Sequence, residues 1–406
     1  MPDLAATLRS TQVIRQRCVN ITRAVDDGRS AHFTLARERL AAVVQRVQAI
    51  TVANHPTLAI PYHSRWRHFE AGGVDRKARL DAALAGRSTA DQARARIDLT
   101  VVSVLLDAGA GPLWGYVEAP GAARFTRSEG LGVASFAAFM AGRFSSDAVD
   151  PLRADAAALQ RIDAAALSEI FQTTAANPLV GLEGRAALLR RLGAALVAEP
   201  TVFGANPRPG GLFDALTRLG TVRHIAAPDV LRALLDHFSV IWPSGSEIGG
   251  VALGDCWRHP HAGGEGASAG WVPFHKLSQW LSYSLLEPFE WAGVTLTDLD
   301  GLTGLPEYRN GGLLLDAGVI VPRAPDFAQR NYRADDEFII EWRALTVNLL
   351  DQIAVLLRER LGRSAAQMPL ACVLEGGTWA AGRAIARERR SDGAPPLQIH
   401  SDGTVF

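Results

Sequence analysis

The segment from Trp271 to Pro288 (WVPFHKLSQWLSYSLLEP) combines residue types that can bind a ligand with a planar end and a hydroxylated end. Pro273 precedes a helical pattern and Pro288 closes it. Leucines spaced four apart form the core face, namely Leu277, Leu281 and Leu285. A second face carries one ammonium, one amide and two aromatic rings, from Lys276, Gln279, Trp280 and Tyr283. The structural alternative is a partly buried aromatic patch beside a lysine whose ammonium reaches solvent.

A second segment, Thr297 to Asn310 (TDLDGLTGLPEYRN), is rich in carboxylates. These belong to Asp298, Asp300 and Glu307, and Tyr308 and Arg309 follow directly. A tyrosine and an arginine beside a carboxylate can hold it in one rotamer and keep it ionised. The structural alternative is a solvated loop with a helix N-cap at Asp300 or Thr303.

A third segment, His55 to Arg76, packs five basic or aromatic residues into six positions: His63, Arg65, Trp66, Arg67 and His68. Such clusters bind phosphate or carboxylate groups, and arginine can do so with two parallel hydrogen bonds. The structural alternative is a surface loop whose arginines pair with local acids such as Glu70.

A fourth segment, Asp255 to His261 (DCWRHPH), suggests a metal site through Cys256, His259 and His261. Its spacing matches neither H-E-x-x-H nor a paired C-x-x-C, and a site on such close ligands needs a tight loop and a distant fourth ligand. The sequence has no G-x-G-x-x-G after a strand, no P-loop and no G-x-S-x-G.

The elements that position these segments are mostly helical. Amphipathic or buried helical periodicity covers residues 3–26, 33–52, 88–108, 130–142, 152–172, 182–198, 227–241 and 335–361. Residues 126–129 (TRSE) have the form of a capping box, and Gly362 is the expected stop of the last helix. Residues 313–321 are a short strand or the end of a helix, and 397–406 predict a hairpin with Asp402-Gly403 at its turn.

The predicted fold is therefore mainly α, with a small β element near the C-terminus. We expect one integrated unit over 1–406, with an N-terminal helical part of about 1–200 and a C-terminal part of about 212–406. The Gly/Pro loop 201–211 separates the two parts.

Composition narrows the class of protein. Lys+Arg and Asp+Glu are both 42, which argues against nucleic acid as a partner. Three distant cysteines without a C-x-x-C pair indicate a reducing compartment. No secretion signal and no membrane-spanning apolar run is seen, so a cytoplasmic protein is expected, and no oligomeric state is implied. Only Lys77 and Lys276 are lysines against 40 arginines, and arginine cannot replace a compact, titratable ammonium.

Several long segments together resemble one family. They are YHSRWRHFEAGGVDR (62–76), GDCWRHP (254–260), VPFHKLSQWL (272–281), LTGLPEYRNGGLLLDAGVI (302–320), GTWAAGRAIARERR (377–390) and SDGTVF (401–406). They resemble a family long filed as a domain of unknown function and associated with uracil catabolism outside the reductive pathway. The resemblance implies a step in which a ribosylurea-type intermediate is cleaved to urea and a sugar phosphate.

A more distant similarity concerns the mechanism. FHKLSQ and LTGLPEYR are similar to the FHK-x-x-Q and LT-x-x-A-D-Y-R pattern of queuosine salvage proteins, which are N-ribosidases with a mostly helical, DNA-glycosylase-like fold. On this match Lys276 takes the place of their active-site lysine and Glu307 that of their catalytic aspartate, while Tyr308 and Arg309 are kept. The change from Asp to Glu is a departure that is consistent with a smaller leaving group.

The first hypothesis is therefore a metal-independent N-ribosidase, without cofactor, acting on a small ribosyl 5′-phosphate. Glu307 stabilises the charge that develops on the sugar or activates water, and Lys276 holds a sugar hydroxyl or keeps Glu307 ionised. His275 and Trp280 cover the leaving group. The other predicted substrate-binding residues are Gln279, Tyr283, Asp300, Tyr308 and Arg309, with His63, Arg65 and Arg67 for the 5′-phosphate.

Two alternatives remain open at this point. One is a zinc-dependent amidohydrolase or deaminase built on Cys256, His259 and His261. The other is a helical protein that binds a ribonucleotide without catalysis.

Overall fold

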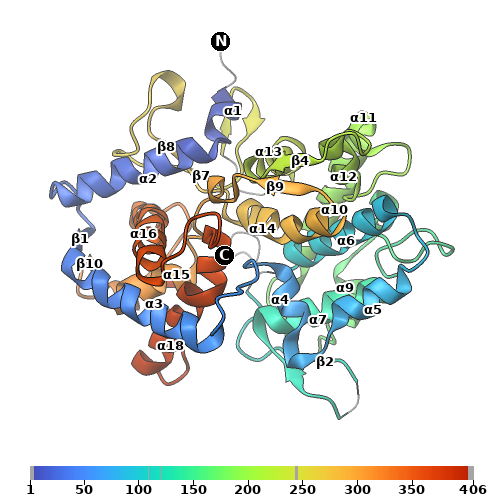
Figure 1. The fold of residues 1–406 in the computed structure, drawn as a ribbon, viewed down its shortest axis with the longest axis horizontal. Coiled ribbons are helices and arrows are strands. Elements are labelled where there is room, and N and C mark those ends of the chain that lie inside the picture. The colour runs from blue at the N-terminus through green and yellow to red at the C-terminus, as the bar shows by residue number, and fades with distance from the viewer. Residues whose placement is uncertain (1–3, 108, 120, 243–245, 401–406) are drawn as a thin grey trace. The chain divides into compact units, whose positions relative to one another are not determined.

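The computed structural model describes residues 4–107, 109–119, 121–242 and 246–400. Most elements are helices and the strands are short, so the prediction of a mainly α protein is confirmed (Figure 1). The described parts of the chain divide into two compact units. Unit 1 comprises the described residues of Met1–His63, Ser244–Gln279 and Asp298–His400, and unit 2 those of Ser64–Pro243 and Trp280–Thr297. Both units draw on chain from either side of the 201–211 loop.

Unit 1 contains both long helices and single helical turns. They are α1 (Leu4–Leu8), α2 (Thr11–Asp26), η1 (Arg37–Arg39), α3 (Leu40–Asn54), η4 (Gly266–Ser268), η5 (Leu299–Gly301), α15 (Tyr308–Asp316), η6 (Phe327–Gln329), α16 (Glu337–Leu361), α17 (Leu370–Val373), the π-helical turn η7 (Leu374–Thr378) and α18 (Trp379–Arg389). Its strands are β1 (Phe33–Leu35), β5 (Glu247–Ile248), β6 (Val251–Ala252), β7 (Cys256–Arg258), β8 (Trp271–Pro273), β10 (Ile320–Pro322), β11 (Asn331–Tyr332) and β12 (Gln398–Ile399). Helix α14 (Lys276–Trp291) begins in unit 1 and ends in unit 2.

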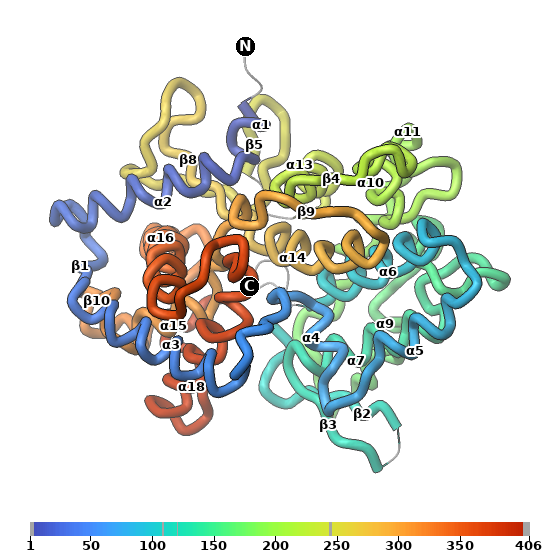
Figure 2. The backbone as a smooth tube through the Cα atoms, viewed as in Figure 1, coloured from blue at the N-terminus to red at the C-terminus, as the bar shows by residue number. Residues whose placement is uncertain are grey.

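Helix α16 is the centre of unit 1. It packs against α2 and α3 and contacts α15 (Figures 1 and 2). Its apolar residues join those of α2 and of the chain around β8 in one core cluster, which includes Ile14, Cys18, Phe274, Ile340 and Val347. The helix ends where the sequence predicts, because Gly362 adopts a left-handed conformation with φ of 61°.

Unit 2 is also helical. Its helices are α4 (Arg65–Phe69), η2 (Ala71–Gly73), α5 (Arg76–Ala83), α6 (Thr89–Leu105), α7 (Arg127–Met140), α8 (Ala156–Leu159), α9 (Ala164–Ile170), α10 (Leu182–Ala198), α11 (Pro200–Phe203), α12 (Gly211–Thr217), α13 (Ala227–Phe238) and η3 (Ser239–Ile241). Its strands are β2 (Tyr116–Val117), β3 (Arg124–Phe125), β4 (His224–Ala226) and β9 (Thr295–Thr297). Helix α6 is buried along most of its length and packs against α7 and α12.

Every sheet among the described residues is a pair of strands. Pairs β1–β10, β2–β3, β5–β6 and β7–β8 are antiparallel, while β4–β9 and β11–β12 are parallel. The predicted β element near the C-terminus is therefore β12 paired with β11. The hairpin turn predicted at Asp402-Gly403 lies outside the described residues.

Some local predictions are wrong for identifiable reasons. Residues 33–35 form strand β1 and not the start of a helix, because they pair with β10 some 290 positions away. Residues 152–172 hold the two short helices α8 and α9. The capping box at 126–129 is not formed: Thr126 precedes α7 but its side chain makes no cap, and Arg127 has a positive φ of 55°.

Pro288 does not end α14, which continues to Trp291. A proline inside a helix has no N–H to donate to the carbonyl four residues earlier, here that of Ser284. The indole Nε1 of Trp66 donates to this carbonyl at 3.2 Å. Trp66 of α4 therefore supplies the hydrogen bond that the proline cannot make. The sequence pattern alone does not reveal this compensation.

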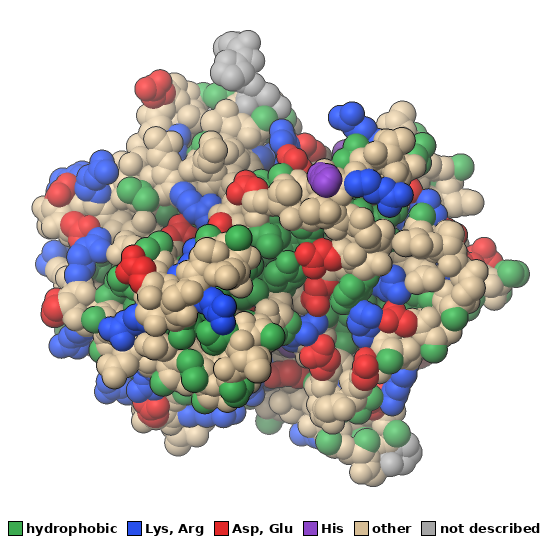
Figure 3. Space-filling model, viewed as in Figure 1, with side chains coloured by type: hydrophobic (Ala, Val, Ile, Leu, Met, Phe, Trp, Pro, Cys, Tyr) green, Lys and Arg blue, Asp and Glu red, His purple; other side chains and the backbone are tan. Residues whose placement is uncertain are grey.

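The surface carries both signs of charge. Figure 3 shows arginine and acidic side chains intermixed over the face drawn there, in keeping with the balanced composition. None of the described helices has both the length and the apolarity needed to cross a bilayer.

A largely buried ion pair fixes the start of α14. The carboxylate of Asp255 accepts two hydrogen bonds from Arg343 of α16, at 2.7 and 2.6 Å, and one from Trp257 Nε1 at 2.6 Å. It also accepts the backbone N–H of Lys276 at 2.9 Å. The side chain of Asp255 is 13% exposed and that of Arg343 is fully buried. Burial alone would raise the pKa of Asp255, but Arg343 and the other donors lower it to about 2.

We expect Asp255→Asn to lower the free energy of unfolding by about 3–5 kcal/mol at pH 7, because it leaves Arg343 as an uncompensated buried charge. The folded pKa of about 2 lies below the ordinary 3.8, so the ionised acid stabilises the fold above pH 4 and this contribution is lost as the pH falls toward 2. Urea unfolding should therefore show the gap between wild type and variant narrowing by about 2 kcal/mol over that range.

The matched control is Asp335→Asn, which removes an exposed acid paired with the exposed Arg333. It should change the free energy of unfolding by no more than about 1 kcal/mol. A gap for Asp255→Asn as small as that of the control, or one that stays constant down to pH 2, would contradict the assigned role.

Candidate functional site

Lys276 is the first residue of α14, and its side chain is half-buried. Before it, His275 adopts a left-handed φ of 49°, a strained conformation for a residue other than glycine. The backbone carbonyl of Asp255 accepts the N–H groups of Phe274 and His275 at 3.0 and 3.1 Å, which holds this turn in place. The position of Lys276 is therefore determined by the loop before β7 as well as by its own helix.

The ring of His275 is used inside unit 1. It is buried, and its Nε2 lies 3.0 Å from the carbonyl oxygen of Leu8. Burial lowers the pKa of His275, so the neutral ring donates this hydrogen bond through Nε2–H at neutral pH. The ring therefore anchors the N-terminal segment, a contact that the predicted role over a leaving group did not anticipate.

Gln279 joins the two segments that carry Lys276 and Glu307. Its Nε2 donates to Thr303 Oγ1 at 2.8 Å, and its Oε1 accepts the backbone N–H of Thr303 at 3.3 Å. Both side chains are buried. A reciprocal buried pair of this kind fixes the register of the two segments, because either residue alone would leave an unpaired polar group.

Glu307 is the N-cap of α15. Its two carboxylate oxygens accept the backbone N–H groups of Arg309 and Asn310, both at 2.7 Å. The cap predicted for this segment at Asp300 or Thr303 is thus four to seven residues too early. The two N–H donors at the start of α15 hold the carboxylate in one orientation.

Tyr308 and Arg309 lie in the first turn of α15, beside this carboxylate. Burial, and then the charge of Glu307, raises the pKa of Tyr308 to about 12, so its phenol stays protonated at neutral pH. Arg309 donates to the carbonyl of Gly393 at 3.0 Å. Its own carbonyl faces Gly382 of α18 so closely that a Cβ there would lie 2.0 Å from the oxygen. Helices α15 and α18 therefore meet at backbone distance.

Asp300 has a structural role. Its carboxylate pairs with Arg358 at 2.7 Å and accepts the backbone N–H of Leu370, also at 2.7 Å. These bonds join η5 to the end of α16 and the start of α17.

The three residues predicted to bind a 5′-phosphate are already paired. His63, in unit 1, lies 2.6 Å from Glu375 through its Nδ1. In unit 2, Arg65 is fully buried against Asp107, Ser103 and the carbonyl of Ser128, and burial lowers its pKa. Arg67 pairs with Glu287 at 2.8 Å and with Glu70 at 3.1 Å. Acidic side chains thus pair with both arginines, but of these acids only Glu70 is local. The segment is also a helix with a buried Arg65, and not the surface loop of the structural alternative.

Trp280 and Tyr283 belong to unit 2 and are buried. The ring of Trp280 lies 5.8 Å from that of His68. The face of α14 that carries Gln279, Trp280 and Tyr283 is thus enclosed by protein, which the helical spacing did not reveal.

Two of the three side chains of the zinc hypothesis, those of Cys256 and His259, are buried. Cys256 is buried, and burial raises the pKa of its thiol. His259 accepts the backbone N–H of His261 through Nδ1 at 3.2 Å, and its Nε2 lies 3.3 Å from Glu341. In the part of the chain that the structure describes, no three His, Cys, Asp or Glu side chains gather as a metal ion requires. The described residues therefore supply no set of ligands for the zinc hypothesis.

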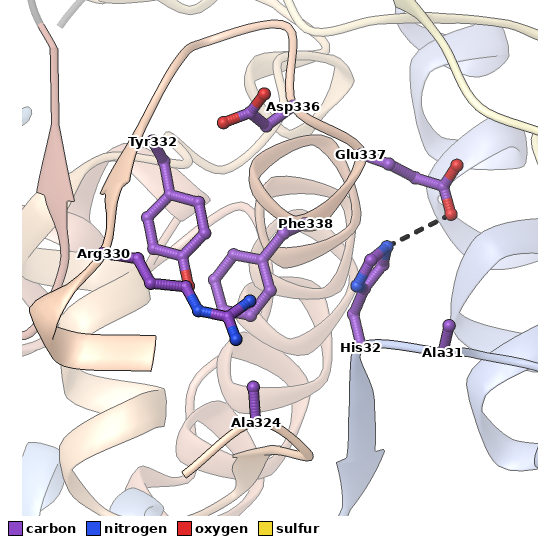
Figure 4. A pocket seen from close by; sticks show the side chains of 8 residues that line it. All are labelled: Ala31, His32, Ala324, Arg330, Tyr332, Asp336, Glu337 and Phe338. Carbon is purple, nitrogen blue, oxygen red and sulfur yellow. Dashed lines mark hydrogen bonds and ion pairs between the residues drawn. The ribbon is translucent and has the colours of Figure 1, made fainter. Parts of the chain in front are cut away.

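A cavity of about 370 Å³ lies elsewhere in unit 1, between the chain before β1 and the first turn of α16 (Figure 4). Figure 4 shows the stacked rings of Tyr332 and Phe338 on one side and the His32–Glu337 pair on the other. It is lined by Ala31, His32, Ala324, Arg330, Tyr332, Asp336, Glu337 and Phe338. None of the predicted site residues lines it, so it does not bear on the motif-based site.

The sequence reasoning missed two pairings. Asp255 was considered only as part of a metal loop, and its partner Arg343 lies 88 positions away. Glu375 precedes the GTWAAGRAIARERR segment and was not singled out, although its partner His63 was. An acid next to two glycines before a conspicuous motif was the one local signal for Glu375.

Comparisons with known proteins agree with the resemblance noted from the motifs. Residues 7–406 match a family described as protein of unknown function (DUF1688). The chain is 38% identical over 413 residues to uracil catabolism protein 4 of Lachancea kluyveri, which covers 94% of this chain and 93% of that protein. It is 37% identical over 413 residues to protein urg3 of Schizosaccharomyces pombe, which covers 100% of this chain and 99% of that protein. The chain therefore belongs to the DUF1688 family.

Proposed function

We propose that this protein acts in uracil catabolism as a hydrolase that cleaves the N-ribosidic bond of a pyrimidine-derived ribosyl 5′-phosphate. Lys276 and Glu307 are its central residues, and the substrate is a ribosylurea-type compound. The names of the relatives support the pathway. The similarity of FHKLSQ and LTGLPEYR to N-ribosidase motifs supports the reaction. The kinship with the DNA-glycosylase-like fold and the cytoplasmic location stay predictions.

The buried Gln279–Thr303 pair is the observation that carries this proposal. Lys276 lies three residues before Gln279, and Glu307 lies four residues after Thr303. Two segments joined at these points keep their ends in a fixed relation, which a reacting centre needs. The pairing thus connects the two motifs that the resemblance assigns to one reaction.

Glu307 suits the role of a charge-stabilising group. Departure of the base or urea builds positive charge on the ribose ring, and a fixed carboxylate stabilises that charge or accepts a proton from the attacking water. The two backbone N–H groups use two of its lone-pair sites, and a carboxylate has about four. The capping geometry and the chemical role are therefore compatible.

Lys276 supplies the opposite charge. An ammonium at the start of α14 can donate to a sugar hydroxyl, and its charge favours the ionised form of a nearby acid. The other lysine of the chain, Lys77, pairs with Asp81 at 2.5 Å and lies 4.4 Å over the ring of Trp291 in unit 2. Lys77 therefore serves as a control for the loss of an ammonium.

We expect Glu307→Gln to lower turnover by about 10²–10³-fold, because one preorganised charge is lost. Glu307→Asp should retain more activity, since aspartate keeps the charge and is a good N-cap. The assay is the release of ribose 5-phosphate from N-ribosylurea 5′-phosphate, with uridine 5′-phosphate as a comparison substrate.

Loss of a helix cap must be separated from loss of catalysis. Asp163 caps α9 through a 2.8 Å bond to the N–H of Ala166, so Asp163→Ala removes a cap away from the motifs. It should cost about 1 kcal/mol of stability and leave turnover unchanged. Wild-type turnover by Glu307→Gln would remove Glu307 from the mechanism, and no release by the wild-type protein would favour the non-catalytic ribonucleotide-binding alternative.

We expect Lys276→Met, which keeps the length of the side chain but removes its charge, to lower kcat/KM by about 10²-fold. Lys77→Met should leave kcat/KM within about twofold of wild type, because the half-buried pair that it breaks contributes only to stability. Equal losses in the two variants, measured with the same substrate, would show that Lys276 has no special role.

A further inference from the structure

The cavity between the chain before β1 and the first turn of α16 contains a buried hydroxyl group. It belongs to Tyr332, which is 6% exposed, and among the described residues its oxygen has no hydrogen-bond partner. In Figure 4 the ring extends from β11 toward the part of the cavity where Ala324 and the guanidinium of Arg330 lie. An unpaired buried hydroxyl costs free energy, because it loses its hydrogen bonds to water on folding. A ligand that enters the cavity and pairs with the hydroxyl would offset this cost.

The aromatic wall that carries the hydroxyl is held in place. The ring of Tyr332 stacks on that of Phe338, with centroids 4.5 Å apart and an interplanar angle of 6°. Phe338 in turn lies 4.4 Å from the ring of Phe33. The carbonyl of Tyr332 accepts the backbone N–H of His400 at 2.7 Å, next to the pairing of β11 with β12. The hydroxyl is therefore positioned before any ligand binds, which lowers the entropy lost on binding.

His32 offers a second polar atom on the opposite wall. Its Nε2 lies 3.2 Å from Glu337 Oε1, and an ionised carboxylate only accepts hydrogen bonds, so Nε2 carries the proton. Its Nδ1 makes no hydrogen bond to any described residue and is an acceptor in the neutral ring. In Figure 4 it is the nitrogen nearer the aromatic wall. The main chain of His32 is also fixed, because its N–H donates to Ser30 Oγ at 2.9 Å and its carbonyl accepts the N–H of Arg323 at 2.8 Å.

Charges of both signs line the cavity. Arg330 contributes a guanidinium, and Asp336 and Glu337 contribute carboxylates. An anion would approach the two acids and a cation would approach the arginine, so the lining favours an uncharged ligand. Arg330 pairs with Asp326 at 2.8 Å, and the two side chains are 53% and 55% exposed. A pair this exposed is weak, so Arg330 can turn toward a ligand at little cost.

The size and the lining of the cavity define the shape of that ligand. A volume of about 370 Å³ is near the lower end for small-molecule sites. Two alanine methyl groups and two aromatic rings supply apolar contact to a flat molecule. The hydroxyl of Tyr332 and the guanidinium of Arg330 can donate to a carbonyl oxygen, while Nδ1 of His32 can accept an N–H.

We propose that this cavity is a binding site for a small, uncharged, planar ring with an N–H beside a carbonyl group, that is, a cyclic amide or imide of the pyrimidine-base type. Tyr332 donates to the carbonyl, His32 accepts the N–H, and the ring lies against the aromatic wall. Neither Lys276 nor Glu307 lines the cavity. Binding there is therefore independent of the proposed hydrolase reaction, and a protein without that activity would still bind the ring.

Uracil is the probe, because it is uncharged and each of its two N–H groups lies beside a carbonyl. We expect isothermal titration of the full chain to show one uracil per chain with a Kd below about 1 mM. 1,3-Dimethyluracil keeps the ring and both carbonyls but has no N–H, and it should bind at least about 10-fold more weakly. Benzoate and benzylamine, which are planar but charged, should also bind more weakly than uracil.

The variant Tyr332→Phe keeps the stacked ring and removes only the hydroxyl. We expect it to bind uracil about 3–10-fold more weakly, the effect of one neutral hydrogen bond. In the absence of uracil the same variant should unfold at a higher urea concentration than wild type, because the unpaired hydroxyl is gone. The matched control is Tyr116→Phe, which alters a tyrosine of unit 2 that is 7% exposed. It should leave the affinity for uracil unchanged.

Several outcomes would overturn the proposal. These are no binding of uracil by the wild-type protein, unchanged affinity in Tyr332→Phe, and benzoate or benzylamine binding as tightly as uracil. Lower stability of Tyr332→Phe in the absence of uracil would show that the hydroxyl is already paired, and would overturn it as well. If Tyr332→Phe fails to fold by circular dichroism, Ala324→Trp decides, because the indole fills the cavity from its wall. Loss of uracil binding in that variant supports the site, and unchanged binding overturns it.

Discussion

A carboxylate removed from water has to find enough donors to offset its desolvation, and in unit 1 the carboxylate of Asp255 meets this demand. Arg343 supplies two parallel bonds, Trp257 a third, and the main chain of Lys276 a fourth. Because Arg343 lies on the central helix α16, the same bonds connect the core of the unit to the first residue of α14. Removal of Arg343 would leave the Asp255 carboxylate as a largely buried charge without its counter-ion.

A series of hydrogen bonds connects this ion pair to the segments that carry the candidate catalytic residues. The left-handed His275 and the first turn of α14 follow Asp255, Gln279 pairs with Thr303, and Glu307 caps α15. Each link uses a buried or backbone-directed hydrogen bond and leaves few rotamers free. Such rigidity has little value for stability alone, since apolar side chains would fill the same space at lower cost. It does have value where reacting groups must stay within a fraction of an ångström.

The sequence predicted what depends on short-range pattern. Helix α10 covers the predicted 182–198, and α16 ends at the predicted Gly362. Prediction from the sequence failed where a partner far away in the chain changes which local structure is most stable. Trp66 satisfies the carbonyl that Pro288 leaves open, and strand β10 pairs with β1 in place of a helix. The candidate site shows the same division. The helical pattern placed Gln279 on α14, but the N-cap role of Glu307 was missed. Glu375 is 312 positions from His63, and no spacing rule connects them.

The contrast between arginine and lysine gains a physical meaning from the structure, though a narrower one than the composition suggests. Arg65, Arg76, Arg185 and Arg343 are fully buried and bind carboxylates or carbonyl oxygens through several N–H groups. A guanidinium suits these fixed joints because its donors are planar and its charge persists under desolvation. Lys77 is itself part of an ion pair over an indole, so rarity alone does not mark a lysine as functional. What distinguishes Lys276 is its context. It follows a strained residue, its main chain is held by a buried charge, and its helix is tied to the segment that presents Glu307.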